Sequence, residues 1–470
     1  MSRFFLHTGT ALIVAVVLLL TTSCATPPFK RDGLAITDVT VIDAEHGARA
    51  NQTVVVVGDE IVYVGNGEGM PRVSQQLDGR GRFLIPGLWD MHVHLTYDDR
   101  FTALMPAEFL RYGITSVRDT GGPLDKLLPV IEALRAPGAR APRVYFSGPL
   151  MDGQSVVYGG GDYPPLGVAN ATPAEAAQRV RELASLGVDF IKVYEMVSPA
   201  IFAAIVDTAT ELGLPIAAHV PLSMRATEAG PRVGSLEHLR NLELDCVTNA
   251  EALRAARQKR LAEEQTLNGF KLRIAIHREQ RMPAIEAMDE ASCARLLRAL
   301  SNTIQVPTAR LNTFNRFPVL ERSDWPAALS LMPASVREDW GKTPAWFKPD
   351  MADRDQRFAQ FNLDMIARMD RAGVPIGAGT DTPILYALPG YSLHNELEIL
   401  VAAGLSERAA LAAATVRPAE FFGLQNQMGL VREGMRADLV LLSADPLKDI
   451  RNTRKIQSVI ARGRMVYQID

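Results

Sequence analysis

The chain has 470 residues, of which 47% are hydrophobic and 22% are charged. A chain of this length and composition can bury a large core, which argues against disorder and favours one large domain with a smaller one. The net charge of −3 and the lack of basic motifs with interleaved aromatic residues argue against a nucleic-acid partner, so we expect a small-molecule substrate.

The N-terminus has the pattern of an export signal. Arg3 precedes an apolar run over 11–20, which is too short to span a membrane, and small polar residues lead to Cys24. Thr21-Thr-Ser-Cys24 resembles a bacterial lipoprotein signal, in which the cysteine is lipidated, although that signal usually has Leu where Thr21 stands. We predict a signal peptide over 1–24 and a protein in the periplasm or at the outer membrane, attached to the membrane only through a lipid at Cys24. Ordinary secretion and a membrane-anchor helix are the alternatives.

Both ends of the chain have the pattern of short antiparallel strands. Runs of β-branched residues separated by turns occupy 36–43, 53–57 and 61–64, and similar runs return only at 437–442 and 456–462. These strands are too few at either end to close a core. We therefore predict that 25–84 and 426–470 together form a small β-sandwich domain.

Between these ends, strands alternate with helices. One helix is well delimited, because Thr172 can cap it, Pro173 can begin it and Glu175 completes a capping box. The candidate strands are 88–95, 115–119, 143–147, 190–194, 216–220, 235–238, 304–308 and 375–380. Eight buried strands alternating with helices predict an α/β fold, a (β/α)8 TIM-type barrel over 85–425, with its active site at the C-terminal ends of the strands.

Two segments exceed what a simple barrel needs. A helix-like insert rich in Arg, Lys and Glu covers about 240–302, and a second insert with Trp and Pro covers about 314–352. Long loops on the catalytic face often form lids or walls of the substrate site, but solvated decoration is an equal alternative. Cys246 and Cys293 can pair in an oxidising compartment, although the sequence gives no geometry to decide this.

The apolar run 83–95 delivers two histidines, His92 and His94, at its end. Side chains two apart on a strand point to the same face, so both imidazoles can reach one metal ion. Such a pair alone is as often packed or solvated as it is a ligand. Further metal-compatible residues decide the matter, because each lies at or near the C-terminal end of a predicted strand: Lys192, His219, His238 and Asp381.

With this ligand set, residues 34–470 resemble the amidohydrolase superfamily, in the branch near imidazolonepropionase-like proteins and Xaa-Pro or Xaa-Arg dipeptidases. The resemblance also rests on Pro86-Gly87, Thr115-Ser-Val-Arg-Asp-Thr-Gly-Gly122, Glu396-Leu-Glu398, Ala402-Ala-Gly-Leu405, Ala414-Thr415, Pro418-Ala419 and Gly429-Leu-Val-Arg-Glu-Gly-Met-Arg-Ala-Asp-Leu-Val440. It implies that His92, His94 and Asp381 hold one divalent ion and that His219 and His238 hold a second. It also implies that Lys192, carboxylated by carbon dioxide, bridges the two ions.

The chemistry implied is hydrolysis. A divalent ion lowers the pKa of bound water from about 16 toward about 7, so hydroxide is available at neutral pH as the nucleophile. Asp381 can take the proton of that water and pass it to the leaving amine, which makes it the predicted catalytic residue. The ligands suit Zn and are compatible with Mn, Fe, Co or Ni.

We therefore predict a metal-dependent amidohydrolase acting on amide or peptide bonds of small molecules, such as dipeptides with a free carboxylate. A lactone or ester hydrolase, a cyclic amidine deaminase and a catalytically inactive binding protein are the alternatives. Arg118 and Tyr194 are candidate substrate contacts, with an ion pair and a packed ring as equal alternatives. His46 and His277 are expected to face solvent and His394 to be a cap or surface residue. The oligomeric state stays open, a homo-oligomer included.

Overall fold

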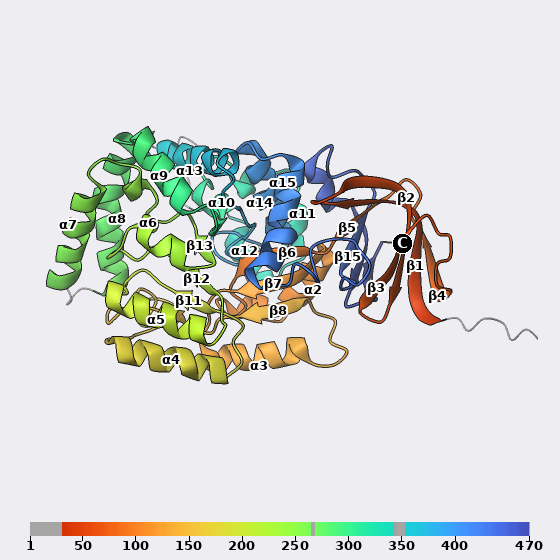
Figure 1. Ribbon diagram of the computed structural model, residues 1–470, viewed down its shortest axis with the longest axis horizontal. Coiled ribbons are helices and arrows are strands. Elements are labelled where there is room, and N and C mark those ends of the chain that lie inside the picture. The colour runs from red at the N-terminus through yellow and green to blue at the C-terminus, as the bar shows by residue number, and fades with distance from the viewer. Residues whose placement is uncertain (1–30, 265–267, 343, 345–352, 470) are drawn as a thin grey trace, which may run out of the picture.

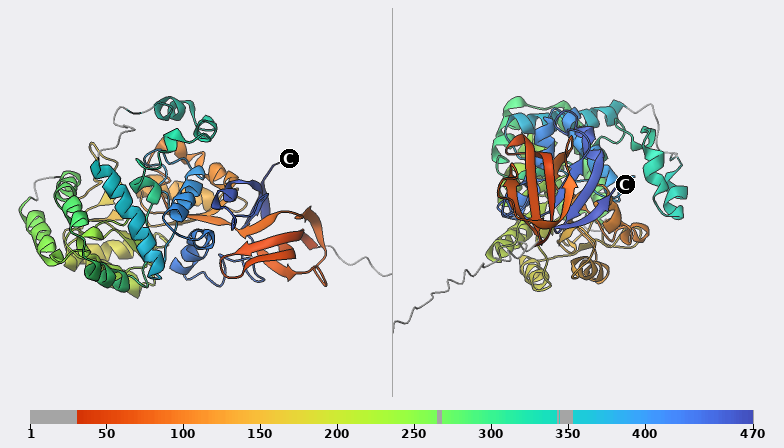
Figure 2. Two further views of the ribbon diagram at one scale, coloured as in Figure 1. Left: turned by 90° about the horizontal axis from the view of Figure 1, so that it is seen from above. Right: turned by 90° about the vertical axis from the view of Figure 1, so that its right-hand side faces the viewer.

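A computed structural model describes residues 31–264, 268–342, 344 and 353–469. The predicted signal peptide and Cys24 lie outside these residues. Among the described helices, none combines the length and apolar character needed to cross a membrane. The molecule is elongated, with a β-sheet at one end and a larger body of parallel strands and helices at the other (Figures 1 and 2).

The end sheet is built from both ends of the chain. Its strand order is β17-β16-β15-β5-β1-β2-β3, and β4 pairs with β1. The pairs β1–β2 and β2–β3 are antiparallel as expected, whereas β4 and β5 run parallel to β1. Whether the sheet is a sandwich domain stays a prediction. The strands are β1 (Arg31–Asp43), β2 (Gly47–Val57), β3 (Glu60–Gly65), β4 (Val73–Asp78), β5 (Phe83–Pro86), β15 (Leu439–Leu442), β16 (Ile456–Ala461) and β17 (Arg464–Gln468).

Alternating valine and isoleucine side chains explain how this sheet packs. Val54 and Val56 on β2 share a buried cluster with Ile36 on β1 and with Leu439 and Leu441 on β15. Residues two apart on a strand face the same side, so the β-branched runs at both chain ends bury one common face.

The larger body contains two parallel sheets. One has the order β6-β7-β8 and the other β10-β9-β11-β12-β13-β14. Their strands are β6 (Leu88–Val93), β7 (Ile114–Asp119), β8 (Arg143–Phe146), β9 (Leu150–Met151), β10 (Gly167–Val168), β11 (Ile191–Val193), β12 (Ile216–Ala218), β13 (Ser235–Glu237) and β14 (Ile304–Val306).

Seven of the eight strands expected here are present within the described residues, and the eighth, 375–380, forms only an isolated bridge from Ile376 to Gln305. Thr382 makes a second parallel bridge to Val93, so this segment lies between β14 and β6. It approaches β6 closely, because a Cβ on Gly379 would lie 2.8 Å from the Cβ of His92. These pairings allow the predicted barrel, and its closure stays a prediction.

Helices cover the parallel strands (Figure 1). Helix α4 begins as its sequence predicts, with Thr172 Oγ1 accepting a hydrogen bond from the N–H of Glu175 at 3.2 Å. The helices are α1 (Asp99–Thr102), α2 (Met105–Arg111), α3 (Leu124–Arg135), α4 (Pro173–Ser185), α5 (Pro199–Glu211), α6 (Ala226–Ala229), α13 (Asp353–Arg371), α14 (Tyr391–Ala402), α15 (Glu407–Ala413) and α16 (Val416–Phe421). Short 3-10 turns occupy Gly230–Arg232, Glu243–Asp245, Val319–Glu321 and Ile450–Arg454.

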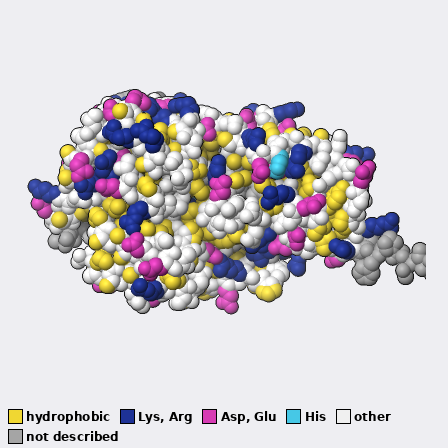
Figure 3. All heavy atoms as spheres, in the orientation of Figure 1, with side chains coloured by type: hydrophobic (Ala, Val, Ile, Leu, Met, Phe, Trp, Pro, Cys, Tyr) yellow, Lys and Arg dark blue, Asp and Glu magenta, His cyan; other side chains and the backbone are white. Residues whose placement is uncertain are grey.

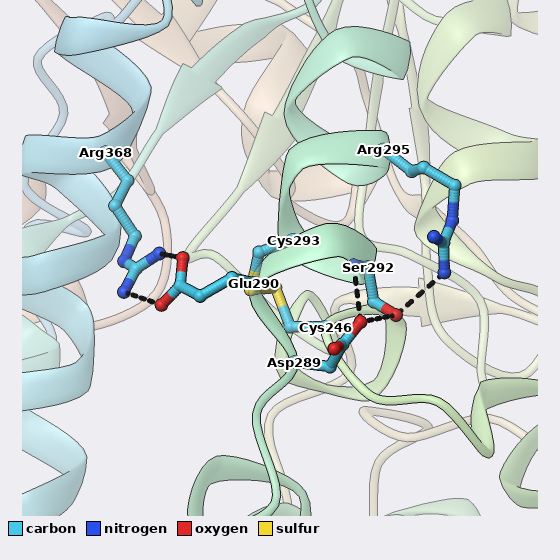
Figure 4. Close-up of a disulfide and its surroundings, with 7 residues drawn as sticks. All are labelled: Cys246, Asp289, Glu290, Ser292, Cys293, Arg295 and Arg368. Carbon is cyan, nitrogen blue, oxygen red and sulfur yellow. Dashed lines mark hydrogen bonds and ion pairs between the residues drawn. A yellow bond between two sulfur atoms is a disulfide. The ribbon is translucent and has the colours of Figure 1, made fainter.

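Both inserts are helical where they are described. The first carries α7 (Ala250–Glu263), α8 (Gly269–Glu286) and α9 (Glu290–Ala299), and the second carries α11 (Trp325–Ser330) and α12 (Ala334–Trp340) after the short α10 (Ala309–Asn312). Helices α7 and α8 lie at the end of the molecule opposite the end sheet (Figure 1). Cys246 and Cys293 form a disulfide that ties the segment after β13 to α9 (Figure 4).

The face seen in Figure 3 carries acidic and basic side chains in a mixed pattern, without a large area of one sign. This distribution agrees with the small net charge of the chain.

Candidate metal centre

The six predicted ligands meet in one cavity. His92 lies on β6 and Lys192 on β11, His94 follows β6, His219 follows β12, His238 follows β13, and Asp381 follows the segment 375–380. All six side chains are buried. The same cavity is lined by Tyr158, Tyr194, Arg240 and Arg273. Strands that run in parallel therefore bring their C-terminal ends to one place, as the sequence predicts.

Each histidine is held through its Nδ1 atom. His92 Nδ1 lies 2.7 Å from Glu237 Oε2, and His219 Nδ1 lies 2.8 Å from Glu195 Oε1. His94 Nδ1 lies 2.7 Å from the carbonyl oxygen of Gly121. Because carboxylate and carbonyl oxygens only accept, these three rings carry their proton on Nδ1 and leave Nε2 free to bind a cation.

His238 follows the same rule through a hydroxyl group. Its Nδ1 lies 2.7 Å from Thr308 Oγ1, and that hydroxyl donates to the carbonyl of Pro307. The hydroxyl hydrogen is therefore engaged, and Thr308 accepts from His238. Burial and the neighbouring His92 hold the pKa of His238 well below its usual range, so the ring is neutral.

Asp381 faces the free nitrogen atoms of two of these rings. Its Oδ1 lies 3.3 Å from His92 Nε2 and 3.2 Å from His94 Nε2. A lone pair on each nitrogen facing a carboxylate oxygen is unfavourable unless a proton or a metal ion lies between them. This donor arrangement therefore fits a divalent cation.

Three of the ligands form the tightest group. One atom each from His92, His238 and Asp381 lie within 4.8 Å of one another. The ring of His238 is centred 4.5 Å from that of His92 and 4.8 Å from that of His219. His238 is thus close to both His92 and His219, which the resemblance assigned to different ions.

Lys192 is a buried amine that forms no ion pair within the described part of the chain. It is 1% exposed, and its Nζ has no hydrogen-bond partner among the described residues. Burial lowers the pKa of Lys192 to about 8. The negative charge of Glu237 opposes this shift, and the positive charge of Arg118 adds to it. The two acids nearest in sequence are engaged elsewhere, Glu195 by His219 and Asp189 by Arg135.

A buried carboxylate joins the two segments that carry His92 and Asp381. Asp90 accepts hydrogen bonds from the N–H of His92 at 3.1 Å, from the N–H of Thr380 at 3.0 Å and from the hydroxyl of Thr380 at 2.6 Å. Asp90 was not among the site residues predicted from the sequence. Its signal was present, because a charged residue interrupts an otherwise apolar run two positions before His92.

Of the two candidate substrate contacts, Arg118 and Tyr194, only Tyr194 lines the cavity. Arg118 is 0% exposed, and its guanidinium donates to Glu237 at 2.7 Å, to Ser235 at 3.0 Å and to the carbonyl of Met91 at 2.6 Å. Arg118 therefore forms the structural ion pair that was the alternative to a substrate contact, and it does not line the cavity. Tyr194 does line the cavity, with its ring 4.3 Å from that of His219.

Two expectations about other histidines are wrong. His277 was expected to face solvent but is buried, because α8 turns the face that also carries Leu272 and Ile276 inward. His394 was expected at a cap or the surface but is buried as well, with its ring nitrogens 2.8 Å from Thr453 Oγ1 and 3.0 Å from the carbonyl oxygen of Tyr112. Both expectations failed because polar flanking residues hid tertiary partners.

Two arginines missed by the sequence analysis add positive charge to the cavity. Arg273 is buried, and its Nε donates to Glu195 Oε1 at 3.0 Å. Arg240 has no ion pair with any residue that the structure describes, and its buried Nε has no hydrogen-bond partner there. Burial and Arg273 lower the pKa of Arg240 to about 10, so it remains charged at neutral pH.

Comparison with known proteins agrees with this geometry. A model described as Amidohydrolase family matches residues 334–466. An imidazolonepropionase of Arthrobacter sp. (strain FB24) is 34% identical over 68 residues, which are 14% of this chain and 17% of that protein. An ochratoxinase of Aspergillus niger is 24% identical over 86% of this chain and 80% of its own length.

The fold is shared with solved structures. A Xaa-Pro dipeptidase with bound methionine superposes with a TM-score of 0.66 at 19% identity, over 93% of this chain and 100% of that one. The family match over 334–466 supports an amidohydrolase as the kind of enzyme, and the solved dipeptidase shows a fold that this chain shares.

Proposed function

We propose that this protein is a metal-dependent hydrolase of carbon–nitrogen bonds in small molecules that carry an anionic group, such as dipeptides and N-acyl amino acids. The observation that supports this most is the convergence of four histidines and Asp381 on one cavity, each histidine held through Nδ1. Histidines oriented in this way suit the binding of a cation better than simple packing in a hydrophobic core.

The residues present fit two divalent ions. Two free imidazole nitrogens face Asp381, and Lys192 is an orphaned buried amine at the same cavity. Carboxylation of Lys192 would replace an unpaired cation by an anionic group with two oxygens, which removes the cost of burying the ammonium beside two ions. Zn is the proposed metal, and Mn, Fe, Co or Ni would suit the same ligands.

When bound, divalent ions supply activation of water at neutral pH and polarisation of the scissile carbonyl. Asp381 stays anionic at neutral pH, so it can accept a proton from the attacking water and deliver it to the leaving nitrogen. Glu237 and Glu195 keep the Nδ1 protons of His92 and His219 in place while this occurs. The products are a carboxylate and an amine.

Arg240 supports the anionic substrate class. It follows His238 by two residues, lines the cavity and has no ion pair within the described part of the chain. Arg273, beside it, is neutralised by Glu195. A free guanidinium in a partly buried position favours a carboxylate, which it can bind through two parallel hydrogen bonds.

The cavity itself is small, with a volume of about 40 Å³. Sites for drug-sized ligands typically measure about 300–1,000 Å³. A dipeptide must therefore move some of the lining side chains as it binds, and compact substrates are favoured.

A substrate panel tests the proposal. Metal-loaded protein should hydrolyse dipeptides or N-acyl amino acids faster than the corresponding C-terminal amides, which lack the carboxylate. Arg240→Met should lower kcat/KM for the carboxylates by about 10- to 100-fold, the value of a charge-assisted hydrogen bond, and should affect the neutral amides less. Arg278→Met, at an exposed position of α8, is the matched control.

Each contrary result points to one alternative. Turnover of esters or lactones alone would indicate the lactone or ester hydrolase, and ammonia release from a cyclic amidine would indicate the deaminase. No hydrolysis of any of these by fully metal-loaded protein would indicate a binding protein.

Export and lipidation at Cys24 are proposed from the sequence alone. Incorporation of a radiolabelled fatty acid into the wild type but not into Cys24→Ser, together with release of that variant from the membrane fraction, would support the anchor. A wild type that incorporates no label would contradict it.

A further inference from the structure

The first insert reaches the metal cavity through helix α8. Arg273 and His277 lie one turn apart on this helix and are only 4% and 6% exposed. Both face Glu195, which follows β11 and is completely buried. An insert that only decorated the surface would not place two ionisable side chains against a buried carboxylate.

Glu195 connects α8 to a predicted metal ligand. Its Oε1 accepts a hydrogen bond from Arg273 Nε at 3.0 Å and lies 2.8 Å from His219 Nδ1. Arg273 gives this fully buried carboxylate a charged partner at 3.0 Å. The carboxylate that holds the His219 ring is therefore itself held by α8.

The orientation of His277 is defined by its other neighbour. Arg281 Nη2 donates to His277 Nδ1 at 3.1 Å, and an arginine can only donate, so the proton of the neutral His277 ring is on Nε2. That Nε2 lies 3.1 Å from Glu195 Oε2, at an angle outside that of a good hydrogen bond. Arg281 in turn contacts Glu243 at 3.3 Å. The α8 contacts thus form a chain from Glu243 to His219.

A second carboxylate–arginine pair shows what this arrangement does. Glu237 holds His92 Nδ1 and is itself held by Arg118, with both residues supplied by the parallel strands. Glu195 holds His219 Nδ1 and is held by Arg273, which the insert supplies. An arginine-bound carboxylate therefore holds one histidine from each of the two expected ion positions. Only the arrangement at His219 depends on the insert.

We propose that helix α8 is part of the metal site, because Arg273 and His277 position Glu195 and Glu195 fixes His219 in the tautomer that leaves Nε2 free for the second ion. Arg273 and His277 are positioning residues in this account. The inference rests on the proposed binuclear site but not on the identity of the substrate.

Metal affinity in the absence of substrate is the direct test. Arg273→Met should weaken binding of the second zinc ion by about 10- to 100-fold, the usual effect of removing a partner that orients a metal-bound histidine, and should leave the first ion in place. Affinities would be measured by competition with a chromophoric chelator. The absorption spectrum of the cobalt-loaded protein would report the altered second site. Arg278→Met, on the exposed face of the same helix, should match the wild type in both measurements.

His277 gives an independent variant in case Arg273→Met does not fold. His277→Leu should weaken binding of the second ion in the same direction, whereas His277→Gln keeps a polar N–H group facing Glu195 and should restore part of the affinity. Circular dichroism and Tm would establish that each variant is folded before metal is added.

The outcomes separate this inference from the proposed function. Folded Arg273→Met and His277→Leu that bind both ions with wild-type affinity would overturn the role of α8. Wild-type protein that binds only one ion would overturn it too. Wild-type protein that binds two ions, loses the second in these variants and hydrolyses no amide would support the role of α8 while contradicting the proposed function.

Discussion

Asp381 is proposed to act both as a metal ligand and as a proton carrier. Its Oδ1 faces the Nε2 atoms of His92 and His94, and its backbone adopts a left-handed conformation with φ of +61°. Its N–H donates to the carbonyl of His92 at 2.7 Å, which holds the residue against β6. The surrounding contacts thus stabilise a backbone conformation that a non-glycine residue seldom adopts.

Asp381→Asn should separate the two roles. The amide keeps an oxygen for the metal but loses the basic carboxylate, so hydrolysis should fall by about 10²-fold or more while most of the metal stays bound. Steady-state kinetics and metal analysis of the same preparation would check this. Near-normal turnover at full metal occupancy would remove Asp381 as the proton carrier.

Lys192→Ala tests the bridging ligand. Removing the side chain should abolish binding of the second ion and most of the activity, because Lys192 is the only lysine among the described residues that line the cavity. Formate or propionate can fill the vacated position and should restore part of both. An alanine variant with two ions and wild-type activity, or a high-resolution map with a bare amine beside two ions, would contradict the bridge.

The meeting of the predicted ligands in one cavity could be expected at the residue level, but the residues that support them could not. His92, His219, His238 and Asp381 were recognisable because each lies at or just beyond the end of a strand predicted from the sequence. Glu195 and Glu237 were not, since their partners Arg273 and Arg118 lie 78 and 119 residues away in the chain. Sequence periodicity shows which side chains share a face of one element, and not which distant side chain meets them.

The ends of two strands also differ from the prediction made from the sequence. The predicted strands at 235–238 and 304–308 end early, at Glu237 and Val306. His238 and Thr308 have φ values of +62° and +44°, so the chain leaves the extended conformation where it presents its functional side chains. Residues that serve the site thus interrupt the pattern from which the strands were predicted.

The disulfide of the first insert gives a prediction for that element. Cys246 and Cys293 are 47 residues apart in sequence, and both are buried. Replacing both by serine should lower the free energy of unfolding by about 2–4 kcal/mol, as expected for a loop of this length. Urea denaturation of the oxidised wild type and of Cys246→Ser/Cys293→Ser would measure the difference. Equal midpoints and slopes would show that the bond contributes nothing to stability.

The whole molecule follows from its composition only in outline. A large apolar fraction and a near-neutral charge indicated a large buried core and a small-molecule substrate, and the parallel strands and end sheet agree with the first. The proposed substrate class depends on Arg240, which lies three residues beyond the end of β13 and lines the cavity, and no local sequence pattern indicated this place.

Metal dependence is the central claim, and titration of metal-free protein tests it most directly. Zinc would be added in small increments while bound metal and hydrolysis of an N-acyl amino acid or dipeptide are measured together. We predict no hydrolysis without metal and a rise that continues until two ions are bound per chain. Hydrolysis that persists at full rate after removal of all metal, or that stays absent with two ions bound, would contradict the account.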